Sequence, residues 1–252
     1  MAASTATVAT ARRLPRGWAH LALQFAFWIA FYFAYQLARG VADREGVAEA
    51  FANGAWIIDF QRSLGSMVEL SFQHAVEQSG LLIQATSLTY WLSQFAVVGI
   101  ALTWVYFKAH HRFYGFRNML IIGNLIGLVG YVLLPTAPPR MFPEAGFTDT
   151  LAAHSTVNHS STFVAFASNP YAAMPSLHAL DATIVSVVMA TVVRRRWAKV
   201  LWLCWAPWVW FAVMATGNHF WLDVAAGVLV AGIAAAIVYR PWRLLRARPA
   251  SA

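Results

Sequence analysis

Long apolar runs recur along this chain of 252 residues. About 20 consecutive apolar residues are enough for a helix to cross a bilayer. Because 60% of the residues are hydrophobic and only 11% are charged, the chain is too apolar for a soluble domain. The sequence therefore predicts an all-α membrane protein with six transmembrane helices. The expected spans are residues 18–38, 82–107, 118–134, 176–193, 198–215 and 219–239.

The polar segments set the predicted domain boundaries. Residues 1–17 are small, polar and basic, so we expect a disordered tail, and residues 241–252 form a second, basic tail. Residues 18–240 form one membrane domain without an internal repeat. Within it, residues 39–80 mix charged and apolar side chains, which is typical of helices that lie along the membrane surface. These surface helices either pack against the bundle or gate lipid entry.

Basic residues are confined to alternate connections between the expected spans. Fourteen of the 18 Lys and Arg lie in the two tails, at Arg240 just before the second tail, or in the connections at 108–117 and 194–199, and no Asp or Glu accompanies them. The positive-inside rule places these segments, and both termini, in the cytoplasm. We therefore expect a multi-pass protein of the cell membrane. Since the basic residues are explained by topology, neither a nucleic-acid partner nor a protein partner is indicated.

His219 and Asp223 carry the strongest chemical signal. Side chains four residues apart on a helix share a face, so the imidazole and the carboxylate would meet one turn apart. A carboxylate bonded to one imidazole nitrogen fixes the tautomer and leaves the other lone pair for attack on an electrophile. We expect His219 to be a nucleophile toward phosphorus. The alternative is a structural pair that joins two helices.

Two further candidates face the same outer side in the predicted topology. The segment Pro175–His178 is typical of a helix start, with Ser176 or its neighbour as the N-cap. An imidazole can exchange a proton near neutral pH, so His178 suits a general acid, although it could simply cap the helix. Arg140 follows a Pro-rich stretch, and its guanidinium matches either substrate phosphate oxygens or a lipid headgroup.

Other polar residues near these positions have open roles. Asp181 lies three residues after His178, and it either orients His178, contacts a polar substrate group or makes a structural hydrogen bond. The outer loop at 141–173 adds residues that either line the site or are solvated, namely Asp149, His154 and His159.

Three short blocks resemble the signature motifs of the type 2 phosphatidic acid phosphatase superfamily, in the same order. They are Pro138-Pro139-Arg140, Pro175-Ser176-Leu177-His178 and His219-Phe220-Trp221-Leu222-Asp223. The resemblance covers about residues 50–240. Within the superfamily, the blocks resemble in particular the branch of inositol phosphorylceramide synthases and sphingomyelin synthases.

The resemblance implies a reaction and a role for each residue. His219 would form a phosphohistidine intermediate, Asp223 would support it, and His178 would protonate the leaving alcohol. Arg140, Ser176 and Asn218 would hold the phosphoryl oxygens, together with nearby backbone amides. No metal ion or other cofactor is implied. The expected partners are a lipid phosphate or phosphodiester, an alcohol acceptor or water, and membrane lipids.

The sequence also departs from the phosphatase pattern. Phosphatase members carry a Lys before the first-motif Arg, but none stands near Leu133, and they carry a Ser-Arg pair where this chain has Ala212 and Val213. Leu177 replaces a Gly that many of them have. Fewer cations weaken the clamp for a phosphomonoester dianion, so phosphodiester substrates or head-group transfer are favoured, although a phosphatase is not excluded.

Two other functions compete with this interpretation. A metal-dependent hydrolase would use His178, His219 and Asp223 as zinc ligands. A proton-coupled transporter would use Asp181, His219 and Asp223 as a relay. Against the transporter, the chain lacks a repeat and its ionisable groups gather at one face.

Overall fold

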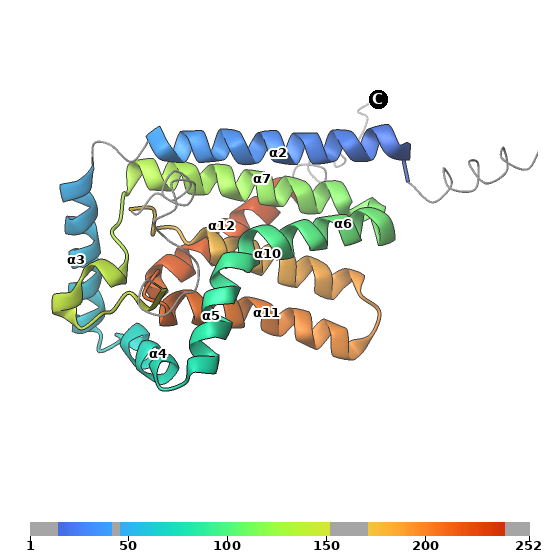
Figure 1. Cartoon of the computed structure of the whole chain (residues 1–252). Helices are drawn as coiled ribbons and strands as arrows, with labels where there is room; N and C mark the ends of the chain where they lie inside the picture. Colours follow the sequence, from blue (N-terminus) through green and yellow to red (C-terminus); the bar gives the residue numbers. More distant parts are fainter. Residues whose placement is uncertain (1–14, 42–45, 152–170, 240–252) are drawn as a thin grey trace, which may run out of the picture.

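The computed structural model describes residues 15–41, 46–151 and 171–239, and all regular elements in these ranges are helical (Figure 1). The predicted all-α class is confirmed. The elements are α2 (Gly17–Val41), α3 (Val47–Ser63), α4 (Val68–Glu77), α5 (Gly80–Leu92), the π-helical turn η1 (Ser93–Val97), α6 (Val98–Lys108), α7 (His110–Leu133), the 3-10 turns η2 (Pro139–Met141) and η3 (Pro143–Ala145), α10 (Leu177–Val192), α11 (Arg196–Ala215) and α12 (Trp221–Tyr239). Apart from residues 15–17, the two predicted tails lie outside the described residues.

Four helical segments of the described chain are long and apolar enough to cross a membrane. They are Gly80–Lys108, His110–Leu133, Arg196–Ala215 and Trp221–Tyr239. The apolar helical segments Gly17–Phe31 and Leu177–Val192 are shorter. The six expected spans therefore correspond to apolar helices, whereas a six-span topology stays a prediction.

Helix α7 begins at His110, and the expectation of a span starting at residue 118 was wrong. Ala109 is both the C-cap of α6 and the N-cap of α7, so Arg112 and Arg117 lie inside the helix instead of in a connection. Counting apolar residues missed these turns because they are polar. Arg117 has a partner within the bundle, because its guanidinium donates to the side-chain oxygen of Gln24 at 2.7 Å.

Helix α10 lies at the centre of the bundle, packed against α7, α11 and α12. Small residues on its neighbours permit close approach. A Cβ placed on Gly127 of α7 would lie 2.3 Å from a methyl carbon of Leu177, and one on Gly227 of α12 would lie 2.2 Å from the carbonyl oxygen of Ser176. The start of α10 is therefore held tightly between two helices.

Helices α3 and α4 cover one end of the bundle, where α3 runs crosswise to α2 and α7 (Figure 1). Buried Ala50 and Ile57 of α3 pack with Phe142, Phe147 and Phe220. The prediction of helices between the first two spans is confirmed, and their inner faces pack against segments that follow α7 and precede α12.

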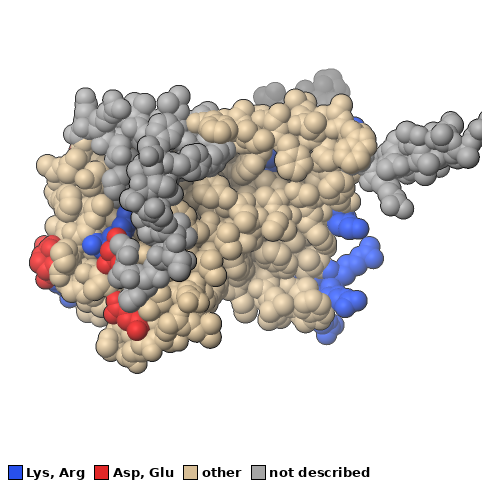
Figure 2. Space-filling model, in the orientation of Figure 1, with Lys and Arg blue, Asp and Glu red and all other residues tan. Residues whose placement is uncertain are grey.

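Charges are distributed unevenly between the two ends of the molecule. Figure 2 shows Asp and Glu, with some Lys and Arg beside them, at the end that carries α3 and α4, and only Lys and Arg among the described charged residues at the opposite end. Arg194 and Arg195, in the connection between α10 and α11, and Arg196, the first residue of α11, are exposed, and this connection lies at that opposite end (Figure 1).

The close packing at Gly227 leads to a prediction for stability, with Gly232 of the same helix as the control. Gly227→Ala should destabilise the protein by about 1–3 kcal/mol, because the new methyl group meets a backbone carbonyl that cannot rotate away. Gly232→Ala, in the same helix, should stabilise it by about 0.5–1 kcal/mol, because a Cβ at Gly232 has no neighbour within 4 Å. Unfolding in detergent micelles measures both. Equal stabilities would contradict the packing described.

Candidate active site

The two histidines predicted from separate motifs lie side by side. His178 is in the first turn of α10, and His219 lies in the segment before α12. Their ring centroids are 5.7 Å apart. Folding therefore brings together the proposed nucleophile and the proposed general acid at the bundle end that carries α3 and α4.

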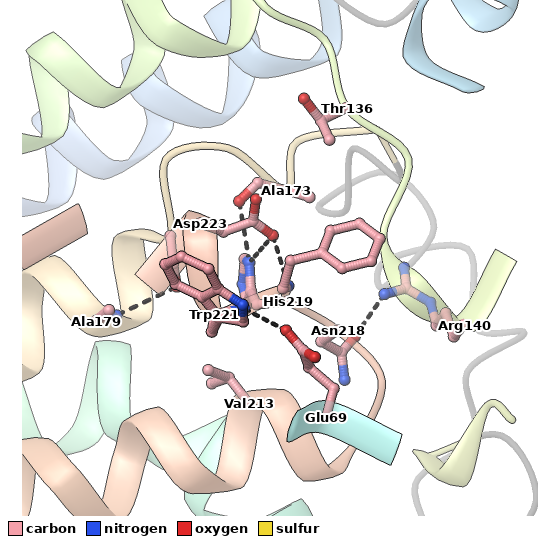
Figure 3. Close-up of polar contacts among 12 residues, drawn as sticks. Glu69, Thr136, Arg140, Ala173, Ala179, Val213, Asn218, His219, Trp221 and Asp223 are labelled. Atoms are coloured by element: carbon pink, nitrogen blue, oxygen red, sulfur yellow. Dashed lines mark hydrogen bonds and ion pairs between the residues drawn. The ribbon is translucent and has the colours of Figure 1, made fainter. Parts of the chain in front are cut away.

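The surroundings of His219 define its tautomer. Its Nδ1 lies 3.0 Å from the carbonyl oxygen of Ala173 and 3.5 Å from Oδ2 of Asp223 (Figure 3). A carbonyl oxygen can only accept, so Nδ1 carries the hydrogen and donates it. The lone pair then lies on Nε2. The backbone of Ala173 is the nearer partner, and no sequence motif predicted this contact.

Asp223 lies next to His219, but by a different geometry from the one predicted. His219 precedes α12, so the two residues do not share a helical face. Instead, Oδ2 of Asp223 accepts a hydrogen bond from the backbone N–H of Phe220 at 2.8 Å, as an acidic residue does in a capping box. Asp223 is fully buried. The capping bond holds the carboxylate next to the imidazole.

Arg140 joins the site through the loop before His219. Its Nη1 donates to Oδ1 of Asn218 at 2.6 Å, and its backbone N–H donates to the carbonyl of Gly217 at 2.8 Å. Gly217 has φ +69°, and a Cβ there would lie 2.8 Å from the carbonyl oxygen of Thr148. Only glycine suits this turn. Oδ2 of Asp149 lies 3.6 Å from Nε of Arg140, so this loop residue forms an ion pair with Arg140.

The Pro-rich stretch before Arg140 forms backbone hydrogen bonds with the segment that carries Ala173 and with α3. The N–H of Thr136 donates to the carbonyl of Tyr171, and the N–H of Ala173 donates back to Thr136. The N–H of Ala137 donates to the carbonyl of Ala50 in α3. This network of backbone hydrogen bonds places the Ala173 carbonyl opposite His219.

Ser176 and Asp181 have structural contacts. Ser176 is the N-cap of α10, as predicted, with its hydroxyl accepting from the N–H of Ala179 at 3.3 Å. Asp181 accepts from Asn124 of α7 at 2.8 Å, which is the structural hydrogen bond among its predicted roles. His154 and His159 lie outside the described residues.

Two residues at the site were missed by sequence reasoning. The ring of Tyr90, from α5, stacks on His178 with centroids 4.5 Å apart. Glu69, from α4, is fully buried, and its Oε1 accepts from the N–H of Trp221 at 2.5 Å and from Gln61 at 2.7 Å. Neither residue is part of a recognisable motif, because each reaches the site only through tertiary packing.

Glu69 satisfies an N–H at the start of α12, one of the groups that a helix leaves unpaired. Burial raises the pKa of the Glu69 carboxyl above its ordinary value, and the hydrogen bonds from Trp221 and Gln61 oppose that rise. Its other oxygen, Oε2, has no hydrogen-bond partner among the described residues. Glu69 thus links α4 to the segment that carries His219.

The described residues contain no group of three or more His, Cys, Asp or Glu that is arranged to hold a metal ion. In particular, Nδ1 of His219 faces Asp223 itself, so these two groups face each other instead of a shared metal position.

Family comparison assigns the chain to a class of enzymes. A family model described as the PAP2 superfamily matches residues 55–237, which is most of the chain. The chain therefore belongs to the PAP2 superfamily, the type 2 phosphatidic acid phosphatases and related phosphotransferases, and the predicted family and enzyme class are confirmed.

A curated relative is the phosphoinositol dihydroceramide synthase of Bacteroides thetaiotaomicron, which is 30% identical over 138 residues. The alignment covers 49% of this chain and 45% of that protein, so the chain spans less than half of its relative's length. No solved structure matches the chain.

The hydrogen bond between Glu69 and the N–H of Trp221 leads to a prediction for catalysis. Glu69→Leu should leave the Trp221 N–H unpaired, destabilise the protein by about 1–3 kcal/mol and lower kcat by about 100-fold through displacement of His219. Glu69→Gln should retain most activity, because its amide oxygen still accepts. Glu77→Gln, on the exposed face of α4, is the control.

The pH dependence of the free energy of unfolding gives a second test of the buried Glu69 carboxyl. Since its folded pKa is raised, ionisation opposes folding, and stability should fall as the pH rises from the ordinary carboxyl range through the raised pKa. Glu69→Gln should remove that component. A Leu variant as active and stable as the wild type would show that the contact does not position His219.

Proposed function

We propose that the protein is a membrane-embedded phosphotransferase that breaks a phosphorus–oxygen bond of a lipid phosphate or phosphodiester through a phosphohistidine at His219. The observation that carries the proposal is the contact of His219 Nδ1 with Ala173 and Asp223, with the ring of His178 beside it. One imidazole is oriented for attack, and a second is near enough to exchange a proton with a substrate oxygen.

In the first step, Nε2 of His219 attacks phosphorus. A nitrogen–phosphorus bond forms while the bond from phosphorus to the leaving alcohol oxygen breaks, and His178 gives that oxygen its proton. Positive charge that develops on the imidazole of His219 is stabilised by Asp223, which lies 3.5 Å from Nδ1. Arg140, held by Asn218, offers its guanidinium to the non-bridging phosphoryl oxygens.

In the second step, His178 accepts the proton of an incoming hydroxyl. The acceptor oxygen attacks phosphorus, the nitrogen–phosphorus bond breaks, and its electron pair returns to Nε2 of His219. Water as the acceptor makes the enzyme a phosphatase or phosphodiesterase, whereas an alcohol makes it a head-group transferase.

We favour transfer from a phosphodiester to an alcohol. Ala212 and Val213 stand where phosphatase members carry a Ser-Arg pair, and both are fully buried and uncharged. A phosphodiester carries one negative charge instead of two, so fewer cations suffice. The name of the B. thetaiotaomicron relative supports the same class, because it describes the synthesis of a phosphoinositol ester of dihydroceramide.

We also propose that the site faces away from the cytoplasm, with both termini cytoplasmic. The uneven distribution of charge supports this orientation, because the connection between α10 and α11, with its exposed Arg residues, lies opposite the end that carries α3 and α4 (Figure 1). Basic segments favour the cytoplasmic side.

A product assay tests the reaction. Purified protein is incubated with labelled lipid phosphates and phosphodiesters, with and without inositol or ceramide-type acceptors, and the products are identified by mass spectrometry. We expect phosphodiester turnover that depends on an alcohol acceptor, survives exhaustive chelation and disappears in His219→Asn. Chelation that abolishes turnover would favour the zinc hydrolase, and uptake into proteoliposomes without chemical change would favour a transporter.

The role of His178 is tested by changing the leaving group. His178→Gln should lower the rate with an alkyl leaving group by about 10²- to 10⁴-fold, because no acid protonates the departing oxygen. A p-nitrophenyl leaving group needs no proton, so its first-turnover release should be nearly normal in the same variant. Equal losses with both substrates would contradict the general-acid role.

A further inference from the structure

A groove separate from the active site runs along the outside of the bundle, between α2 and the η1–α6 segment. Its volume is about 1140 Å³, slightly above the roughly 300–1,000 Å³ of typical small-molecule pockets. The lining residues are Trp18, Phe25, Phe95, Ala96, Gly99, Ile100, Thr103, Trp104, Phe107 and Lys108. We propose that this groove binds one acyl chain of an anionic phospholipid, whose phosphate lies at Lys108.

The lining excludes a polar occupant over most of its length. Lys108 is its one charged residue, and the hydroxyl of Thr103 is already bonded to the carbonyl of Gly99 at 2.8 Å. Phe95, Ile100 and Phe107 are exposed. Because α6 belongs to a segment apolar enough to cross a membrane, these side chains face acyl chains.

The length and polarity of the groove fit a lipid from one leaflet. Lys108 follows Phe95 by 13 positions, which corresponds to roughly 20 Å of helix. One leaflet contributes about 15 Å of hydrocarbon. Exposed Lys108 ends α6 at the end of the bundle opposite α3 and α4 (Figure 1), and exposed Trp18 lies at the same end of the groove. Lysine and tryptophan at a membrane interface match a lipid phosphate and its glycerol region.

Gly99 gives the groove its depth. Glycine is a poor residue for a helix interior, yet it stands here in α6, and a Cβ at this position has no neighbour within 4 Å. A larger side chain would fit without a clash and would fill the groove. Gly232 of α12 is equally open but does not line the groove, so it supplies a matched control.

Lipid binding in the groove is tested by measuring which lipid stays bound to the purified protein. The protein is purified from vesicles of phosphatidylcholine with or without phosphatidylglycerol, and bound lipid is identified by native mass spectrometry. We expect retained phosphatidylglycerol in preference to phosphatidylcholine, about fivefold weaker binding in Lys108→Gln, and loss of the lipid in Gly99→Leu. Gly232→Leu and Lys199→Gln, at positions outside the groove, should bind as the wild type does. Equal retention by all variants, or of both lipids, would overturn the proposal.

A second measurement uses the wild-type chain alone. Photoactivatable phosphatidylglycerol should label the peptide that contains residues 95–108 above other membrane-facing helices. Even labelling of those helices would identify general lipid contact only and would overturn a specific site. Because neither readout involves catalysis, failure here is distinguishable from failure of the proposed reaction.

Discussion

The hydrogen bond from His219 to the carbonyl of Ala173 fixes which ring nitrogen carries the hydrogen and which keeps its lone pair. It does so with a backbone oxygen, which stays in place whatever the protonation state of the carboxylate beside it. That oxygen is positioned by the pairing of Ala173 with Thr136, and the same Pro-rich stretch bonds to α3 and to Gly217. The proposed nucleophile is therefore oriented by a network of backbone hydrogen bonds that joins four distant parts of the chain.

Two carboxylates that accept hydrogen bonds from the start of α12 also hold the segment of His219 in place. Asp223 accepts from the N–H of Phe220, and Glu69 accepts from the N–H of Trp221. Both bonds satisfy groups that the helix itself leaves unpaired, and both fix the residues directly after His219. The same two hydrogen bonds therefore cap α12 and hold the segment that carries His219. They also explain how α4, which carries none of the three motifs, contributes to the active site.

Sequence reasoning succeeded where a residue's role follows from its own segment. Apolar runs located the helices, and helix-start chemistry identified Ser176 as a cap. The order of the motifs, with alternating charge, predicted that His178 and His219 would meet. It failed where tertiary packing decides. The start of α7 was misplaced because its first turns are polar and paired within the bundle, and Glu69 and Tyr90 were missed because no local pattern marks a side chain that reaches the site across the fold.

Trapping the covalent intermediate tests the central claim most directly. The enzyme is mixed with a lipid phosphodiester labelled at phosphorus in the head-group portion and quenched in alkali, in which a nitrogen–phosphorus bond survives, before the label is located by peptide mass spectrometry. The account predicts acid-labile label on the peptide that contains His219, formed before product and discharged by the acceptor. Turnover without label on this peptide, or label at His178 instead, would contradict it.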